Sequence, residues 1–204
     1  MAPTTWRTGG PEIGPFEVAV GAVLVQHAAW RNAELALNAL RDAGALAATI
    51  SCALPIAELE RLVRSSGTFR LKAARIHKLA RWWELVYPEI LSQPTGAVRA
   101  ALLGVQGIGP QTADRILLYA FGRPAVVVDA YLRRVQGRTV EESYGALNAE
   151  LARELPDQVP WLSRAHAAIV THAQTHCRKI PNCDGHPIRL QFRRGQCRHG
   201  QGST

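Results

Sequence analysis

The chain has 204 residues, of which 24 are lysine or arginine and 16 are aspartate or glutamate, so its formal net charge is +8. A chain of this length forms one large domain or two small ones. The basic balance favours a polyanionic partner such as nucleic acid, and it excludes an acidic tail or an acidic disordered protein. Helix-forming residues dominate and long strand-like alternations are missing from the sequence, so we predict an all-α protein with two helical domains.

Residues 1–15 predict an irregular arm, because glycine and proline recur there. This arm does not have the pattern of a signal peptide, and the apolar stretch Val18–Val25 is far shorter than the roughly 20 residues that a membrane span needs. We therefore expect a soluble protein of the cytoplasm, located at the nucleoid.

Apolar periodicity and breaks at glycine or proline then predict a series of helices. The first is mostly buried because apolar residues cover nearly all of its faces, and Gly44 ends the second. In the fourth, Trp82, Trp83 and Tyr87 lie on a stripe that faces the core. The expected helices span residues 15–30, 32–43, 55–65, 72–91, 97–105, 110–121 and 130–135.

Residues 99–121 predict two helices joined by a tight turn that contains Gly107 and Gly109, with the second helix starting near Pro110. Two glycines one residue apart let the backbone turn sharply and approach a ligand closely. The second helix offers free N–H groups and the positive end of its dipole, which suit a phosphate of a DNA backbone. An ordinary helical hairpin, in which the glycines only allow tight packing, is the alternative.

A single carboxylate follows the next apolar run. The segment Ala125–Val128 is uniformly apolar and should be buried, and Asp129 is expected to be thrust out at its end, before the helix 130–135. Aspartate is a favoured N-cap that stabilises a helix by about 1 kcal/mol. Alternatively, this carboxylate faces the same groove as the hairpin and does chemistry there. The sequence leaves both interpretations open.

The segments GVQGIGPQTADRILLYAF and VVVDAYLRRV resemble the helix-hairpin-helix and the Gly/Pro-rich loop with its aspartate that define the endonuclease III superfamily of DNA glycosylases. The resemblance covers about residues 15–197 and is closest to the branch that includes the bacterial 3-methyladenine DNA glycosylases. It implies a monomer with damaged double-stranded DNA in a cleft between two helical domains. One would be a six-helix bundle of residues 16–123, and the other would combine residues 1–15 and 124–204.

The resemblance implies that Asp129 is catalytic. A glycosylase flips the damaged base out of the duplex, and an ionised carboxylate near C1′ then stabilises the positive charge that builds on the sugar. Bifunctional family members carry a Schiff-base lysine in the hairpin, where this chain has Gln111, and an amide nitrogen is not a nucleophile. We therefore expect a monofunctional DNA N-glycosylase with weak or absent AP-lyase activity.

The substrate is less closely defined. No motif supplies a second acid to protonate the leaving base, so a base that is already cationic, such as an N-alkylated purine, is favoured. Two alternatives remain: a bifunctional glycosylase and AP lyase for oxidised pyrimidines, and a non-catalytic helix-hairpin-helix module that only binds DNA.

The resemblance also implies residues that contact DNA. It places Gln26 at the interface, in the gap left by the flipped base, although this residue could equally be the polar end of a buried helix. His27 and Trp30 follow within one turn and can line the base pocket, because aromatic faces stack on bases. The DNA-contacting residues expected in the hairpin are Gly107, Gly109, Gln111 and Thr112.

Three of the four cysteines lie near the C-terminus, which is typical of a metal-ligand set rather than of a disulfide framework. The family holds a [4Fe-4S] cluster on four cysteines, and the resemblance implies such a cluster here with one histidine ligand. Three thiolates and one imidazole also suit a structural zinc ion, and an empty site is a third possibility. The expected ligands are Cys177, Cys183, His186 and Cys197, with five, two and ten residues between successive members instead of the family's six, two and five.

Basic residues surround this ligand set. A solvated charged loop is the usual meaning of such a run, but the net charge favours contact with DNA phosphates. The residues concerned are Arg178, Lys179, Arg189, Arg193, Arg194 and Arg198.

Overall fold

The computed structural model describes residues 13–139 and 141–177. These residues are helical and contain no strand, which confirms the all-α prediction. No helix within them is both long and apolar enough to span a bilayer. In chain order the elements are α2 (Pro15–Leu24), α3 (Trp30–Asp42), α4 (Ala48–Ala53), α5 (Ile56–Leu62), the 3-10 turn η1 (Arg64–Ser66), α6 (Phe69–Ile90), α7 (Thr95–Leu103), α8 (Pro110–Tyr119), α9 (Ala130–Val135), α10 (Tyr144–Glu154) and α11 (Val159–Thr175).

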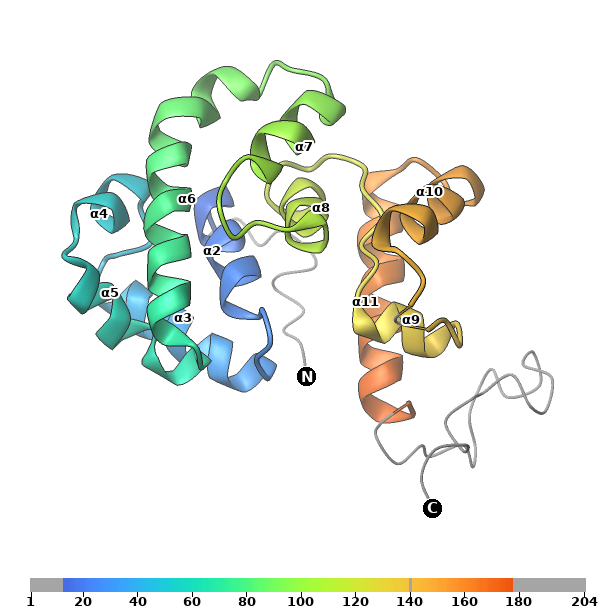
Figure 1. The fold of residues 1–204 in the computed structure, drawn as a ribbon, viewed down its shortest axis with the longest axis horizontal. Coiled ribbons are helices and arrows are strands. Elements are labelled where there is room, and N and C mark those ends of the chain that lie inside the picture. Colours follow the sequence, from blue (N-terminus) through green and yellow to red (C-terminus); the bar gives the residue numbers. More distant parts are fainter. Residues whose placement is uncertain (1–12, 140, 178–204) are drawn as a thin grey trace.

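The helices form two groups, which Figure 1 shows side by side. The first group, α2–α8, encloses a large apolar core, and the second, α9–α11, encloses a smaller one. The chain passes from one group to the other after α8. Within α8, Leu117 belongs to the first core and the next residue, Leu118, belongs to the second. Because α8 contributes to both cores, it is the element that fixes the two groups to each other.

The first core is built around α2 and α6. Nearly all of α2 is buried, as its uniformly apolar sequence predicts, because it packs against α3, α6 and α8. The aromatic residues of α6 lie in or next to this core: the ring of Trp83 stacks on that of Tyr87 at a centroid distance of 4.3 Å and meets the edge of Phe16 at 5.4 Å. The core positions predicted for Trp83 and Tyr87 are therefore confirmed.

The end of α2 differs from the prediction. The helix stops at Leu24 instead of continuing to Trp30, and residues 25–29 form a turn in which His27 has a φ of +49°. A buried lysine explains this ending. The ammonium group of Lys72 donates hydrogen bonds to the carbonyl oxygens of Leu24 (2.7 Å) and Ser66 (2.5 Å). A side chain thus satisfies the Leu24 carbonyl, which in a longer helix would accept from the N–H group four residues further along.

The segment that leads into the second group is extended and buried at Val126, Val127 and Val128, as its apolar sequence predicts. The side-chain amide of Asn148, on α10, donates to the carbonyl oxygen of Val126 at 2.7 Å. This bond anchors the segment to α10. The position of Asp129, the next polar residue, is therefore set by the packing of the second core.

Candidate active site

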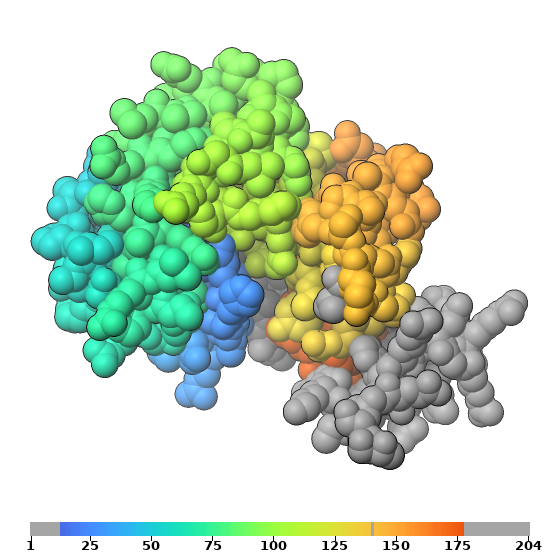
Figure 2. Space-filling view, in the orientation of Figure 1, coloured from blue at the N-terminus to red at the C-terminus, as the bar shows by residue number. Residues whose placement is uncertain are grey.

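A cleft of about 750 Å³ opens between the two groups of helices. Figure 2 shows the surface hollowed between the α2–α8 group and the α9–α11 group. The cleft is lined by the turn after α2, the hairpin before α8, the exposed side of α8, the start of α9, and α11. It contains most of the residues that the sequence predicted for the site: Gln26, His27, Trp30, Gly107, Gly109, Gln111, Thr112 and Asp129.

The hairpin between α7 and α8 requires a glycine at one of its two positions. Gly107 has a φ of +94°, and a Cβ added there would lie 2.5–2.8 Å from side-chain atoms of Arg75. Gly109 is the N-cap of α8 with a φ of −85°, and a Cβ there would meet no atom within 4 Å. The first glycine is therefore needed for the fold, whereas the second leaves open space in front of the start of α8.

Gln26 fastens the turn after α2 to this hairpin. Its amide nitrogen donates to the hydroxyl of Thr112 (2.9 Å) and to the carbonyl oxygen of Gly107 (3.2 Å), and its amide oxygen accepts from Arg75 (2.5 Å). The Thr112 side chain is buried and directed to Gln26, so only its backbone is offered at the start of α8. Contact of either residue with DNA remains a prediction.

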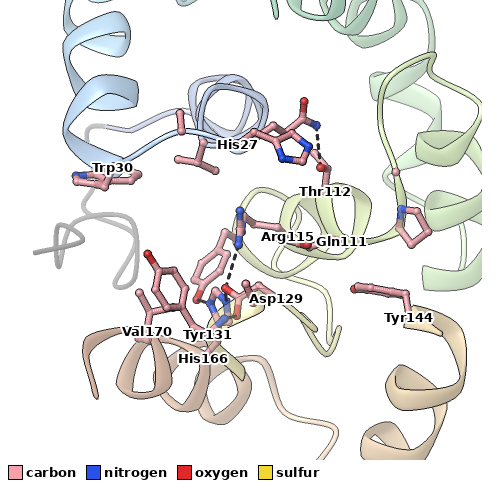
Figure 3. A pocket seen from close by; sticks show the side chains of 18 of the residues that line it. His27, Trp30, Gln111, Thr112, Arg115, Asp129, Tyr131, Tyr144, His166 and Val170 are labelled. Atoms are coloured by element: carbon pink, nitrogen blue, oxygen red, sulfur yellow. Dashed lines mark hydrogen bonds and ion pairs between the residues drawn. The ribbon is translucent and has the colours of Figure 1, made fainter. Parts of the chain in front are cut away.

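The remaining predicted cleft residues lie on opposite sides. Figure 3 shows His27 and Trp30 on the side of the α2–α3 turn, with Asp129, Tyr131 and His166 facing them. His27 is exposed and Trp30 is partly buried. Two ring side chains thus line the cleft on the side opposite the carboxylate, and such rings can stack on a nucleobase.

Asp129 is the best-connected side chain of the cleft, and it is not thrust out as the sequence suggested. Its residue is only 3% exposed. Oδ1 accepts hydrogen bonds from the backbone N–H groups of Tyr131 (3.0 Å) and Leu132 (2.9 Å), so the carboxylate turns back over the start of α9. Oδ2 accepts from Arg115 (3.3 Å) and from His166 (3.1 Å) on the cleft side.

These contacts keep the carboxylate ionised. Burial alone would raise the pKa of Asp129, but the hydrogen bond and charge of His166, the charge of Arg115 and the N–H of Leu132 outweigh it. The pKa of Asp129 therefore lies below the usual aspartate value. The cleft contains an anion at neutral pH that the protein itself holds in one orientation.

The sequence did not identify three residues that complete this cluster: Arg115, His166 and Tyr119. Arg115 lies one helical turn after Gln111, so the spacing on α8 could have placed it in the cleft. His166 comes from α11, 37 residues after Asp129, and Tyr119 contacts the other nitrogen of its ring at 2.7 Å. Nothing in a single sequence indicates that such distant residues meet.

A second buried network joins the hairpin to α10. Asp114 is 1% exposed and accepts two hydrogen bonds from Arg99 of α7, at 2.6 and 3.1 Å. Its Oδ2 also accepts from the hydroxyl of Tyr144 at 2.7 Å, and burial together with this carboxylate raises the pKa of Tyr144. The network connects α7, α8 and α10, and it therefore holds the two sides of the cleft at a fixed distance.

Of the expected metal ligands, Cys183, His186 and Cys197 lie outside the described residues. Cys177 follows α11 and is buried, and its carbonyl oxygen accepts a hydrogen bond from Arg134 of α9 at 2.8 Å. A thiol at the end of α11 is compatible with a ligand set that continues along the chain beyond it. The described residues contain no group of three or more metal-binding side chains.

Comparison with known proteins identifies the family. No family model matches the chain. One relative is a protein of Methanocaldococcus jannaschii that is provisionally named a DNA repair glycosylase. The two sequences are 33% identical over 183 residues, which cover 85% of this chain and 83% of the relative. The chain is also 30% identical over 158 residues, 74% of its length and 68% of the other's, to endonuclease III of Bacillus subtilis. An endonuclease III structure in a non-covalent complex with DNA superposes with a TM-score of 0.76 and 26% identity, over 92% of this chain and 87% of that one. The chain therefore belongs to the endonuclease III superfamily of DNA glycosylases.

Proposed function

We propose that this protein is a monofunctional DNA glycosylase of base-excision repair, which hydrolyses the N-glycosidic bond of a damaged base flipped into the cleft. The single observation that carries the proposal is the ionised, oriented Asp129 in a cleft that His27 and Trp30 also line. The endonuclease III–DNA complex that the fold matches supports DNA as the partner. Damaged double-stranded DNA would bind to a monomer across the mouth of the cleft.

In the proposed reaction, different residues hold the strand, replace the flipped base and stabilise the sugar. The hairpin holds the strand through the backbone at Gly107 and Gly109, Gln26 occupies the space left by the flipped base, and Trp30 stacks on that base. As the bond to the base breaks, positive charge builds on the sugar, and the negative charge of Asp129 stabilises it. Water then adds to C1′ and releases a proton to the solvent, so the products are the free base and an abasic site.

We propose that AP-lyase activity is absent because no lysine in the described part of the chain is placed to form a Schiff base. Gln111 lies in the first turn of α8 at the mouth of the cleft, and its amide does not form a Schiff base. Among the described residues no lysine lines the cleft. Burial and the nearby charge of Arg75 lower the pKa of Lys72 to about 8, but its ammonium group is fully enclosed and bonded to two carbonyl oxygens.

The surroundings of Asp129 support N-alkylated purines as substrates. Both ring nitrogens of His166 are engaged, one with Asp129 and the other with Tyr119, and a guanidinium such as that of Arg115 does not donate its proton at neutral pH. Neither of the two side chains that contact Oδ2 of Asp129 is therefore free to protonate a leaving base. A base that already carries a positive charge leaves without that help.

A strand-cleavage assay tests the proposal. Duplexes with one 3-methyladenine, hypoxanthine, thymine glycol or uracil are incubated with the protein, and half of each sample is then treated with alkali. We expect breaks only after alkali, and we expect Asp129→Asn to lower the excision rate by at least about 100-fold while DNA affinity is kept.

The other outcomes of this assay decide between the alternatives. Breaks without alkali, together with a protein–DNA adduct trapped by borohydride, would support the bifunctional glycosylase and AP lyase and would contradict the role given to Gln111. Excision of none of the lesions would favour the non-catalytic DNA-binding module, with Asp129 serving only as a helix cap.

We also propose a [4Fe-4S] cluster on Cys177, Cys183, His186 and Cys197, with a structural zinc ion as the alternative. Three thiolates and an imidazole can hold either, and the cluster or ion would tie the C-terminal segment to the end of α11. Elemental analysis of the purified protein distinguishes iron from zinc, and Cys177→Ser should lower the metal content whichever metal is bound.

A further inference from the structure

Two side chains contact Asp129 among the described residues, and of these only His166 is itself held by a further side chain. Its Nε2 lies 3.1 Å from Oδ2 of Asp129, and its Nδ1 lies 2.7 Å from the hydroxyl of Tyr119. Its side chain is only 11% exposed. The three side chains form a continuous chain of hydrogen bonds along one wall of the cleft, from α9 through α11 to α8.

We propose that His166 is a positioning residue that holds Asp129 as an oriented carboxylate for excision, and that Tyr119 fixes His166 for this task. This inference rests on the function proposed above. His166 itself touches neither the sugar nor the base in this arrangement, because both of its ring nitrogens are directed to protein groups.

The chain of hydrogen bonds works for either charge state of the imidazole. In the neutral ring, Nε2–H donates to Asp129 and Nδ1 accepts from the Tyr119 hydroxyl. In the imidazolium, both nitrogens donate, and the Tyr119 hydroxyl turns its proton to the carbonyl oxygen of Ser163, which lies 3.3 Å away. The donor to Asp129 is thus kept in both states, which a lone histidine beside a carboxylate would not guarantee.

Arg115 differs from His166 in this respect. Its contact with Oδ2 of Asp129 is longer, at 3.3 Å, and it is the only hydrogen bond of this guanidinium within the described part of the chain. Arg115 acts on the pKa of Asp129 through its charge, whereas His166 adds a hydrogen bond of fixed direction to the effect of its own charge. Removing His166 should therefore leave burial as the dominant influence on Asp129 and raise the pKa of this carboxyl.

The charged or titratable side chains that line the cleft with Asp129 are Arg75, Arg115, Tyr119, Tyr131, Arg134, Tyr144, His27 and His166.

The test compares His166→Leu, which removes the donor, with His166→Gln, which can place an amide N–H near the position of Nε2. Tyr119→Phe keeps the ring but removes the hydroxyl that fixes His166. The first measurement follows the ¹³C signal of the Asp129 carboxyl against pH in the free protein. We expect the pKa of Asp129 to rise by about one to two units in His166→Leu, and by less in His166→Gln and Tyr119→Phe.

The second measurement is the pH profile of single-turnover excision. We expect the acid limb to move to higher pH in His166→Leu and to return toward the wild-type position in His166→Gln, while affinity for a duplex with an uncleavable abasic analogue stays within about threefold. An unchanged Asp129 pKa in His166→Leu, or a His166→Gln variant that behaves like it in both measurements, would overturn the inference and leave His166 a packing residue.

The two measurements keep this inference separate from the proposed function. If the wild-type protein excises no lesion, the glycosylase proposal fails, yet the carboxyl titration still shows whether His166 controls Asp129. If His166→Leu does not fold, His166→Gln and Tyr119→Phe still decide the question, because an Asp129 pKa equal to that of the wild type in Tyr119→Phe contradicts the role given to the hydroxyl.

Discussion

The two tasks that the sequence left as alternatives for Asp129, helix cap and proposed catalytic carboxylate, fall to different oxygens of its side chain. Oδ1 caps α9 by accepting from two backbone N–H groups, and Oδ2 is directed to the cleft, where Arg115 and His166 contact it. Because different oxygens are used, the helix cap does not compete with the electrostatic role. The cap also stabilises the start of α9, which has only six residues.

The lowered pKa of Asp129 has a consequence for stability. A carboxyl whose pKa is lower in the folded than in the unfolded chain makes the folded state bind fewer protons, so the free energy of unfolding rises with pH between the two pKa values. This contribution is complete above the usual aspartate pKa of about 4 and is lost as the pH falls through the folded-state value. Asp129→Asn keeps the cap but presents an amide to the N–H groups of Arg115 and His166. We expect the variant to be about 1–3 kcal/mol less stable than the wild type at pH 7, and the difference to shrink well below about pH 4.

Urea denaturation of both proteins at the two pH values measures this difference. Asp157→Asn, at an exposed position before α11, is the matched control and should change the stability little at either pH. If the wild type is more stable than Asp129→Asn by the same free energy in acid as at pH 7, Asp129 is not held as an anion by its neighbours.

The sequence could identify Asp129 because two local signals coincide there: an apolar run that ends, and a favourable N-cap before a helix. It could not determine the exposure of the carboxylate, because the covering groups come from α8 and α11. Arg115 and His166 meet Asp129 only through the packing of the second core, and such contacts leave no trace in local periodicity.

At the scale of elements, the hairpin owes its shape to contacts with α6 and with the turn after α2. Arg75 of α6 lies directly against Gly107 and also donates to Gln26, which in turn bonds the Gly107 carbonyl oxygen. The hairpin therefore does not stand alone: its backbone is positioned by side chains from two other elements. This coupling makes the two glycines respond differently to substitution.

We expect Gly107→Ala to destabilise the protein, because alanine at a φ of +94° is strained and its Cβ would displace Arg75. The left-handed conformation alone costs about 1–2 kcal/mol, which corresponds to a fall in Tm of about 2–8 °C for a chain of this size. Gly109→Ala meets no atom within 4 Å at an ordinary φ, so its Tm should change little. Its Cβ instead enters the space in front of α8, where the phosphate is proposed to approach, and DNA affinity should fall.

Thermal unfolding and DNA titration of both variants separate the two roles. Equal affinity of Gly109→Ala and the wild type for DNA would indicate that the backbone does not approach a phosphate at this position. An unchanged Tm in Gly107→Ala would instead contradict the geometry described for the hairpin.

The starts of helices were more predictable than the ends. Proline at the beginning of α2 and of α8, and Asp129 before α9, mark their first residues clearly. The end of α2 carries no glycine or proline and depends on Lys72, whose position 48 residues later gives no local signal. The short helix α4 was not predicted either, since its six residues show no clear period and Ala47 before it gives no start signal of the kind that Asp129 gives for α9.

At the scale of the whole molecule, the cleft depends on α8, because this helix contributes to both apolar cores. Asp114 of α8 also bonds to side chains of both groups of helices. Arg99 approaches this carboxylate from the bundle and Tyr144 from the second group. The composition of the chain predicted an all-α protein with a polyanionic partner, but the width of the cleft depends on these buried contacts. Charge is the property of the whole molecule that the sequence gives most directly, and it can be tested without knowledge of the lesion.

The excess positive charge should make DNA affinity strongly dependent on salt, since each neutralised phosphate contributes about 0.9 to the slope of log K against log salt. Arg193 and Arg194 belong to the basic C-terminal segment, outside the described residues, and we expect each Arg→Ala change there to lower the slope by about 0.9 and the double change by about 1.8. Arg61→Ala removes the same charge from α5, which Figure 1 shows on the side of the bundle away from α9–α11, and where Arg61 pairs with Glu58. Its slope should equal that of the wild type. Equal slopes for all of these variants would place Arg193 and Arg194 outside the DNA interface and contradict the prediction for this part of the C-terminal segment.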